Sequence, residues 1–170
     1  MNKNNEKVVL DFCRVKKIFE KGFGFLPSLH YPENVFFHFS KIKDEEKRKS
    51  LLTLKRGIVS VFFTSNLLNG KRKVDKVWLD VSEVPETFLH DFIERLIFEL
   101  NDGVMNPFET IDALSQLISI NKLTEQNLKD IASSKKILIN PSILEKLFSK
   151  DEKEKMEKFI NISNEKGRNF

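Results

Sequence analysis

The chain has 170 residues, which allows one or two domains with a real hydrophobic core, and its 40% hydrophobic and 32% charged residues exclude wholesale disorder. Its apolar runs fall short of the roughly 20 residues that a membrane helix needs, and the polar start "MNKNNEKVV" lacks the apolar core of a secretory signal. The single cysteine, Cys13, cannot form an internal disulfide. We therefore expect a cytoplasmic protein in which this thiol is buried and structural.

The net charge of +4 conceals an asymmetry between the two halves of the chain. Residues 1–82 contain 17 Lys and Arg and 9 Asp and Glu, which gives +8. Residues 83–170 contain 12 and 16, which gives −4. This asymmetry predicts two modules with different partners, of which only the basic one suits a polyanion.

The basic half reads as five strands. Their β-branched and aromatic residues fall in short runs at 8–19, 22–26, 34–39, 57–67 and 71–81. Asn69-Gly70 predicts a type I′ hairpin turn between the last two runs. The charged segment 41–53 is expected to be a loop that carries a short helix starting near Asp44. Five short strands without a crossover helix predict a small antiparallel barrel.

The acidic half changes to apolar spacings of three and four residues, which predict amphipathic helices. The first helix is expected over 85–100 and ends at Asn101-Asp102-Gly103. Asn106-Pro107 combines a capping residue with a proline at the first helical position, so it starts the second helix. Thr124 is expected to cap a short third helix.

A fourth helix is expected to open at Asn140-Pro141, and the apolar stripe that ends at Ile160 either continues it or forms a fifth. Strands followed by helices indicate separate domains. We therefore predict an α+β chain with a barrel domain at 1–82 and a helical domain of four to five helices at 83–170. The boundary is expected near Ser82–Pro85.

Aromatic rings alternate along the segment "KGFGFLPSLHYPENVFFHFS", residues 21–40. Because successive strand residues point to opposite faces, this alternation separates two sets of rings. Val35 and Phe37 form one set and are natural core residues. The other set would form an exposed aromatic plate for stacking unpaired bases, made of Phe23, Phe25, Phe36 and His38. The alternative is that all the rings belong to the core of a chain with 16 phenylalanines.

Two stretches of this segment, "KGFGFL" at 21–26 and "NVFFHFS" at 34–40, resemble the two ribonucleoprotein motifs of the cold-shock domain family. They stand in the family's order and close to its spacing. The upstream "RVKKIFEK" and the downstream "SLLTLKRGIVSVFF" and "KRKVDKVWL" resemble the rest of the domain, so the likeness spans residues 8–81. The resemblance implies a five-stranded OB-type barrel that binds single-stranded RNA or DNA with little sequence preference.

The resemblance also implies which residues bind. It assigns stacking roles to Phe23, Phe25, Phe36, His38 and Phe39, and a binding lysine to Lys16. Lys17 and Ile18 stand where the family has an exposed Trp and a Phe, which would weaken one end of the plate. Lys17 would replace part of that loss by contacting phosphate.

Basic residues cluster beside these motifs. The clusters are Lys16, Lys17 and Lys21, then Lys55 and Arg56, and finally Lys71, Arg72 and Lys73. In OB folds the loops that join strands 1–2 and 4–5 frame the nucleic-acid face. We therefore expect Lys16, Lys21 and Arg72 to contact phosphates, whereas the alternative is that these are ordinary surface cations.

The sequence contains no convincing motif for an active site, and we expect a protein that is not an enzyme and needs no cofactor. His30 and His90 are isolated from residues at metal-ligand spacing, so no metal site is expected. Trp78 is expected in the core or at the domain interface.

The preferred function is binding of single-stranded nucleic acid, RNA in the first place, as an RNA chaperone or a regulator of translation or transcription. The alternative is a protein-interaction adaptor whose helical domain, residues 83–170, docks a partner while the barrel serves as a scaffold. A third hypothesis has the acidic half fold over the basic face and restrain binding. Homodimerisation through the helices stays open.

Overall fold

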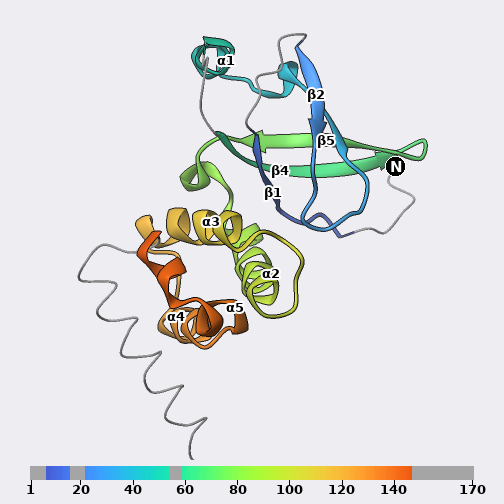
Figure 1. Cartoon of the computed structure of the whole chain (residues 1–170). Helices are drawn as coiled ribbons and strands as arrows, with labels where there is room; N and C mark the ends of the chain where they lie inside the picture. Colours follow the sequence, from blue (N-terminus) through green and yellow to red (C-terminus); the bar gives the residue numbers. More distant parts are fainter. Residues whose placement is uncertain (1–6, 16–21, 54–58, 147–170) are drawn as a thin grey trace, which may run out of the picture. The chain divides into compact units, whose positions relative to one another are not determined.

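The computed structural model describes residues 7–15, 22–53 and 59–146 (Figure 1). The chain divides into two compact units, residues 1–88 and 89–170. This division lies slightly beyond Ser82–Pro85, because the short 3-10 turns η2 (Val81–Glu83) and η3 (Glu86–Phe88) belong to the first unit. Among the helices in the described ranges, none has the length and apolar content needed to cross a membrane.

The first unit is built on a curled five-stranded sheet. Its strands are β1 (Asp11–Val15), β2 (Phe23–Leu26), β3 (Val35–His38), β4 (Val59–Leu68) and β5 (Lys71–Trp78). Their order across the sheet is β1-β4-β5-β3-β2, and β4 and β5 run side by side as a long hairpin (Figure 1). The pairs β1–β4, β4–β5 and β2–β3 are antiparallel.

The prediction of an all-antiparallel sheet was wrong, because β3 and β5 pair in parallel, with Phe36 opposite Lys73. These strands are separated in the chain by the helix α1 (Glu45–Thr53) and by β4. No hairpin turn therefore sets their relative direction. Alternation along a strand predicts which face each side chain takes, but it does not identify a non-local neighbour.

The local turn and capping signals in the first unit are confirmed. Asn69 and Gly70 both have positive φ, 53° and 77°, as a type I′ turn requires. The Asp44 carboxylate accepts a hydrogen bond of 2.9 Å from the backbone N–H of Glu46, in the first turn of α1. Both signals act within a few residues, so they do not depend on the rest of the fold.

The core of the first unit lies on the inner face of the sheet. It receives side chains from all five strands and from the segment that follows β3. These residues are Cys13, Leu26, Val35, Phe37, Phe39, Ile42, Val61, Phe63 and Val74. The buried position of Cys13 agrees with a structural thiol.

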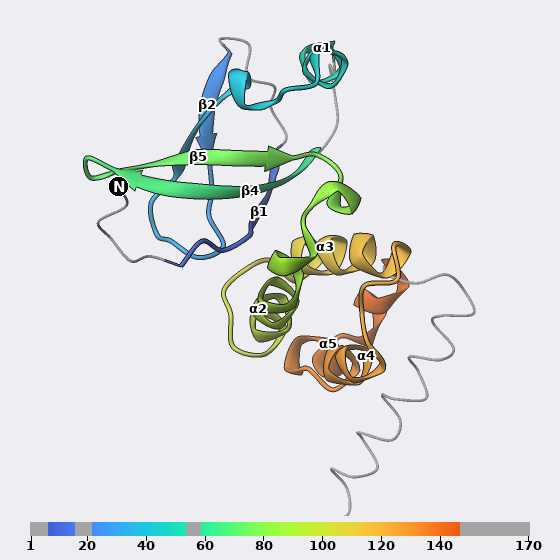
Figure 2. The ribbon, with the colours of Figure 1, turned by 180° about the vertical axis from the view of Figure 1, so that it is seen from behind.

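The second unit is helical (Figure 2). Its elements are α2 (Leu89–Asn101), α3 (Pro107–Ser119), α4 (Glu125–Ala132), α5 (Lys135–Ile139) and the 3-10 segment η4 (Pro141–Lys146). The predicted starts of the second and third helices are confirmed, since Asn106 caps α3 and Thr124 forms a capping box with Asn127 on α4. The short α5 was not predicted, and η4 stands where a regular fourth helix was expected. The proposed continuation to Ile160 lies outside the described residues.

The loop after α2 is held by two charged side chains, the buried Glu99 and the half-buried Lys136. The Glu99 carboxylate accepts hydrogen bonds from Arg95 (3.1 Å) and from the backbone N–H of Met105 (3.0 Å). The Lys136 ammonium donates to the carbonyls of Glu99 and Gly103, at 2.6 and 3.0 Å. The bond to the Glu99 carbonyl satisfies an acceptor in the last turn of α2. Together these bonds fix the path between α2 and α3.

Gly103 is required by this arrangement. A Cβ at this position would lie 1.7 Å from Oε2 of Glu99 and 2.5 Å from its Cα. We predict that Gly103→Ala lowers the unfolding free energy by about 1–3 kcal/mol, because the loop must shift to admit the methyl group. Urea denaturation followed by circular dichroism at the helix band measures this change. Val104→Ala is the control at a fully exposed neighbour, and equal stability of the two variants would contradict the prediction.

Candidate nucleic-acid interface

The hairpin of β2 and β3 carries an exposed aromatic plate, consisting of Phe23, Phe25, Phe36 and His38. Phe23 pairs with His38 and Phe25 with Phe36, so all four side chains share the outer face. The side chains of Phe23 and Phe25 are 43% and 59% exposed, Phe36 is half-buried, and His38 is exposed. The ring centroid of Phe36 lies 6.1 Å from that of Phe23 and 5.7 Å from that of Phe25. The expected facing of the four side chains is confirmed.

His38 is held in place by the turn that follows β3. Its Nδ1 accepts a hydrogen bond of 3.1 Å from the backbone N–H of Ser40 and lies 2.9 Å from the Ser40 hydroxyl. Because Nδ1 is an acceptor here, the proton of the neutral imidazole is on Nε2. The ring therefore has a fixed orientation at one end of the plate and retains one outward N–H donor.

Phe39 does not belong to the plate. Its side chain is only 7% exposed, and its ring packs 5.8 Å from that of Phe37 in the core. The stacking role that the family resemblance implied for Phe39 is therefore corrected. The two-residue period explains the difference, because it assigns Phe39 to the inner face with Val35 and Phe37.

Arg72 is not a free phosphate contact either. The residue is 6% exposed, and its guanidinium carbon lies 3.5 Å from the centroid of the Tyr31 ring. Its Nε donates to Oε1 of Glu33 at 3.4 Å, and its Nη1 donates to the Ser65 hydroxyl at 3.2 Å. The predicted phosphate contact of Arg72 is thus corrected, because this side chain instead links β5 to the loop between β2 and β3.

A pocket of about 600 Å³ adjoins the plate. Phe25 and Phe36 form its aromatic side, and the tip of the β4–β5 hairpin forms another. Its lining residues are Phe25, Glu33, Asn34, Phe36, Gly70, Lys71, Arg72 and Lys73. Glu33 and Asn34 were not predicted from the sequence, although an acidic residue and an amide directly before the second aromatic motif were a usable signal.

The loop that supplies Glu33 and Asn34 is anchored by a buried carboxylate. Asp11 accepts hydrogen bonds from the backbone N–H of Leu29 (2.7 Å) and from the Ser28 hydroxyl. The Ser28 oxygen in turn accepts from the backbone N–H groups of His30 and Tyr31, both at 3.0 Å. Burial raises the pKa of Asp11, and these hydrogen bonds oppose the rise. His30 adds a bond of 2.8 Å from Nε2 to the Leu10 carbonyl.

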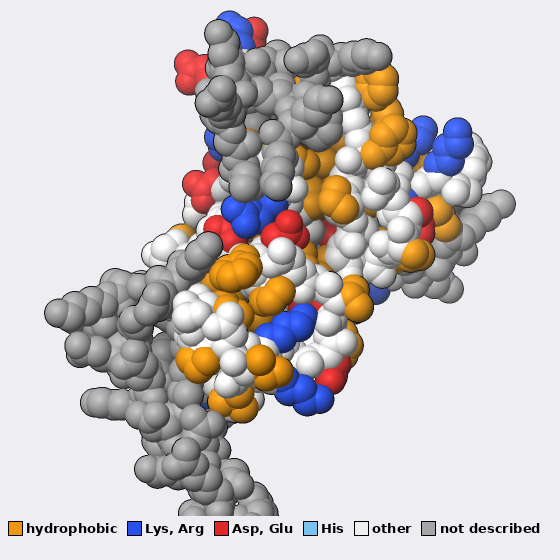
Figure 3. Space-filling model, viewed as in Figure 1, with side chains coloured by type: hydrophobic (Ala, Val, Ile, Leu, Met, Phe, Trp, Pro, Cys, Tyr) orange, Lys and Arg blue, Asp and Glu red, His pale blue; other side chains and the backbone are white. Residues whose placement is uncertain are grey.

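Exposed lysines lie next to the plate at the β4–β5 turn. Lys71 and Lys73 are both exposed and line the pocket. Figure 3 shows hydrophobic side chains gathered over β2, with Lys and Arg side chains beside them toward this turn. The predicted contacts Lys16, Lys17 and Lys21, and the cluster Lys55 and Arg56, lie outside the described residues.

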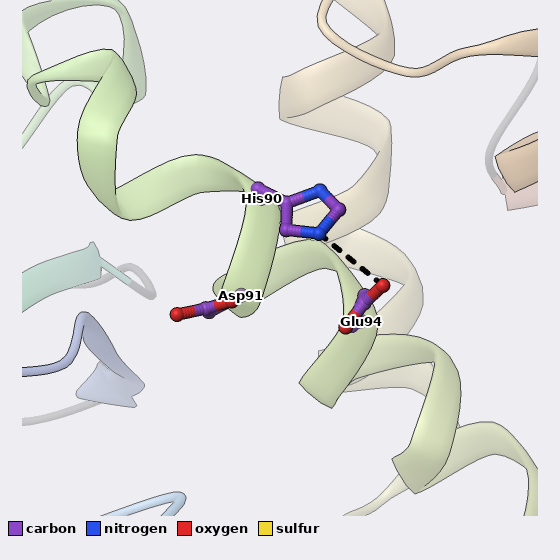
Figure 4. A group of neighbouring side chains, drawn as sticks. All are labelled: His90, Asp91 and Glu94. Atoms are coloured by element: carbon purple, nitrogen blue, oxygen red, sulfur yellow. Dashed lines mark ion pairs between the residues drawn. The ribbon is translucent and has the colours of Figure 1, made fainter.

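His90 is not isolated, contrary to the sequence analysis. Its Nε2 lies 3.4 Å from Oε1 of Glu94, and Asp91 completes a group of possible ligand atoms within 4.8 Å of one another (Figure 4). All three residues are exposed on α2, in the second unit. An ion pair between residues four apart is ordinary on a helix surface and accounts for the contact. We assign no metal site to it.

The chain matches no protein-family model, no curated protein and no solved structure in the comparisons made. The resemblance to the cold-shock domain family therefore stays a prediction that rests on the two aromatic motifs. The geometry of the plate, the pocket and the lysines carries the functional argument instead.

We predict that Asp11→Ala lowers the unfolding free energy of the first unit by about 2–4 kcal/mol, because it leaves several buried donors in the loop without an acceptor. Trp78 fluorescence during urea denaturation reports on this unit, and Asp75→Ala on β5 is the control. Unfolding curves that coincide for wild type and Asp11→Ala would refute the anchoring role.

Proposed function

We propose that the protein binds single-stranded nucleic acid, with RNA as the preferred ligand, through the aromatic plate and the lysines beside it. The observation that carries this proposal is the exposure of the plate: Phe23 and Phe25 keep about half of their surface in solvent. Burial in the core explains why Val35 and Phe37 are apolar, but it does not explain apolar rings at these exposed positions. A flat aromatic surface beside positive charge suits unpaired bases, each of which gains about 1–3 kcal/mol by stacking.

We further propose that the first unit is an OB-type barrel of the cold-shock kind. Two features support this assignment. β4 returns to lie beside β1, as the fourth strand of a Greek key does. The plate occupies β2 and β3 with the β4–β5 turn beside it, and OB folds bind oligonucleotides with this face and this loop.

Stacking on rings is tolerant of sequence, because every base has a π face. The plate by itself would therefore accept many unstructured strands. Broad binding of this kind suits an RNA chaperone or a regulator of translation or transcription. A second function, docking of a protein partner, is favoured by exposed apolar side chains on the helical unit, namely Phe98, Val104, Phe108, Leu138 and Ile139.

Removing one ring from the plate tests the proposal. We predict that Phe25→Ala weakens binding of an unstructured oligouridine by about tenfold, since one base loses its stacking partner. Fluorescence anisotropy at low salt measures the affinity. Phe108→Ala is a matched control, because it removes a partly exposed phenylalanine from the other unit.

The two variants must differ if the plate binds bases. Equal affinities of wild type, Phe25→Ala and Phe108→Ala would show that binding occurs elsewhere. A wild-type chain that does not bind oligouridine even at low salt would refute the proposed function altogether.

The lysines of the β4–β5 turn give a separate prediction. If Lys71 and Lys73 contact phosphates, the double variant Lys71→Gln/Lys73→Gln should bind more weakly at low salt. It should also reduce the slope of log affinity against log salt by about 1.4, which is about 0.7 for each lost contact with a single strand. Titrations between about 50 and 200 mM salt measure this slope, and an unchanged slope would exclude both lysines from the phosphate track.

A further inference from the structure

The pocket beside the plate is large enough to hold a single nucleobase. Its volume of about 600 Å³ falls within the roughly 300–1,000 Å³ of small-molecule sites. Phe25 and Phe36 contribute to both the plate and the pocket. A strand that stacks on these rings can therefore place its next base in the pocket, where polar groups meet the base edge.

Glu33 is a pocket residue that is oriented by a neighbouring side chain and can still contact the edge of a base. Arg72 is buried and stacked on Tyr31, and its Nε donates to Oε1 of Glu33 at 3.4 Å. The Glu33 side chain is nevertheless 49% exposed. An ionised carboxylate has about four lone-pair sites, so the bond from Arg72 orients Glu33 while leaving most of its acceptor capacity open.

The charge of Glu33 limits what it can recognise. A carboxylate repels phosphate and accepts hydrogen bonds without donating any. Its partner must therefore be a donor, either a ribose hydroxyl or a base edge that carries N–H groups. Within a strand, only a base edge can offer two neighbouring donors to the two carboxylate oxygens. Guanine offers two neighbouring donors, N1–H and the N2 amino group, which match the two oxygens of a carboxylate. Adenine and cytosine each offer one amino group on this edge, and uracil offers one ring N–H.

Asn34 adds a hydrogen-bond donor that also suits guanine. It lines the same pocket directly after Glu33, and its amide can donate to the O6 acceptor that lies beside N1 on guanine. Lys71 and Lys73 line the pocket as well, so the backbone phosphate of the same nucleotide meets positive charge there. The pocket thus offers an acceptor pair, a donor and cations to one nucleotide.

We propose that this pocket is a guanine subsite, in which Glu33 reads the N1–H and N2 amino donors and Arg72 positions Glu33. This inference rests on the proposed function and deepens it. The plate supplies binding to any unstructured strand, and the pocket adds a preference for guanine at one position.

The test compares four labelled oligonucleotides of about eight nucleotides, a length within the range that OB folds cover. One is oligouridine, and the others carry a single central guanine, adenine or cytosine. Fluorescence anisotropy is measured with the full chain as wild type, Glu33→Gln and Glu45→Gln. The Glu33→Gln change keeps the side-chain shape but replaces one acceptor oxygen with a donor amide. Glu45→Gln removes the same charge from an exposed position on α1.

Wild type and Glu45→Gln should bind the guanine strand about tenfold more tightly than the other three. Glu33→Gln should lose this preference and bind oligouridine at least as well as wild type. Equal binding of all four strands by wild type would overturn the guanine subsite while leaving the proposed function intact. A guanine preference that survives in Glu33→Gln would overturn the role of Glu33. Absence of binding to every strand would refute the proposed function, and the subsite with it.

Discussion

The burial of one face of the β2–β3 hairpin determines the candidate site. Leu26, Val35 and Phe37 each lose nearly all of their solvent exposure in the core of the first unit. Because side chains alternate along a strand, this burial directs the neighbouring rings outward. A slip of one residue in the pairing would turn the plate toward the core and turn the core residues toward solvent. The free energy gained by burying those apolar side chains would then be lost. The exposed rings are therefore a consequence of the same contacts that stabilise the fold.

A second constraint joins the plate to the rest of the sheet. Asp11 on β1 anchors the loop after β2, and Arg72 on β5 contacts Tyr31 and Glu33 in the same loop. The loop is thus held from two strands that lie far apart in the sequence. Burying a carboxylate and a guanidinium is costly unless their hydrogen bonds are made. Several of their partners are groups of this loop, so the path of the loop and the shape of the pocket depend on each other.

Local signals predicted much of this architecture. Four of them each marked a turn or a helix start that the structure contains, namely Asn69-Gly70, Asp44, Asn106-Pro107 and Thr124. Alternation also predicted which rings share a face, but the choice of an exposed plate over an all-core arrangement came from the family resemblance. Extending the same alternation by one more step places Phe39 with the core, but the prediction followed the family resemblance at this residue.

Non-local features were beyond the reach of these signals. The parallel β3–β5 pair brings together segments separated by a helix and a strand, and no short motif encodes that contact. The burial of Arg72 could not be predicted for the same reason, since its partners Tyr31 and Glu33 come from a loop that is distant in the sequence. In the second unit, α5 is too short to show a clear apolar period.

The central claim is that bases stack on the outer rings of the β2–β3 hairpin. Nuclear magnetic resonance of the full chain with assigned aromatic side chains tests it most directly, by titration with oligouridine. The ring signals of Phe23, Phe25, Phe36 and His38 should shift strongly, because a stacked base places its ring current over them. Those of the buried Phe37 and Phe39 should move much less. Saturable binding that leaves the four outer ring signals unchanged would contradict the account.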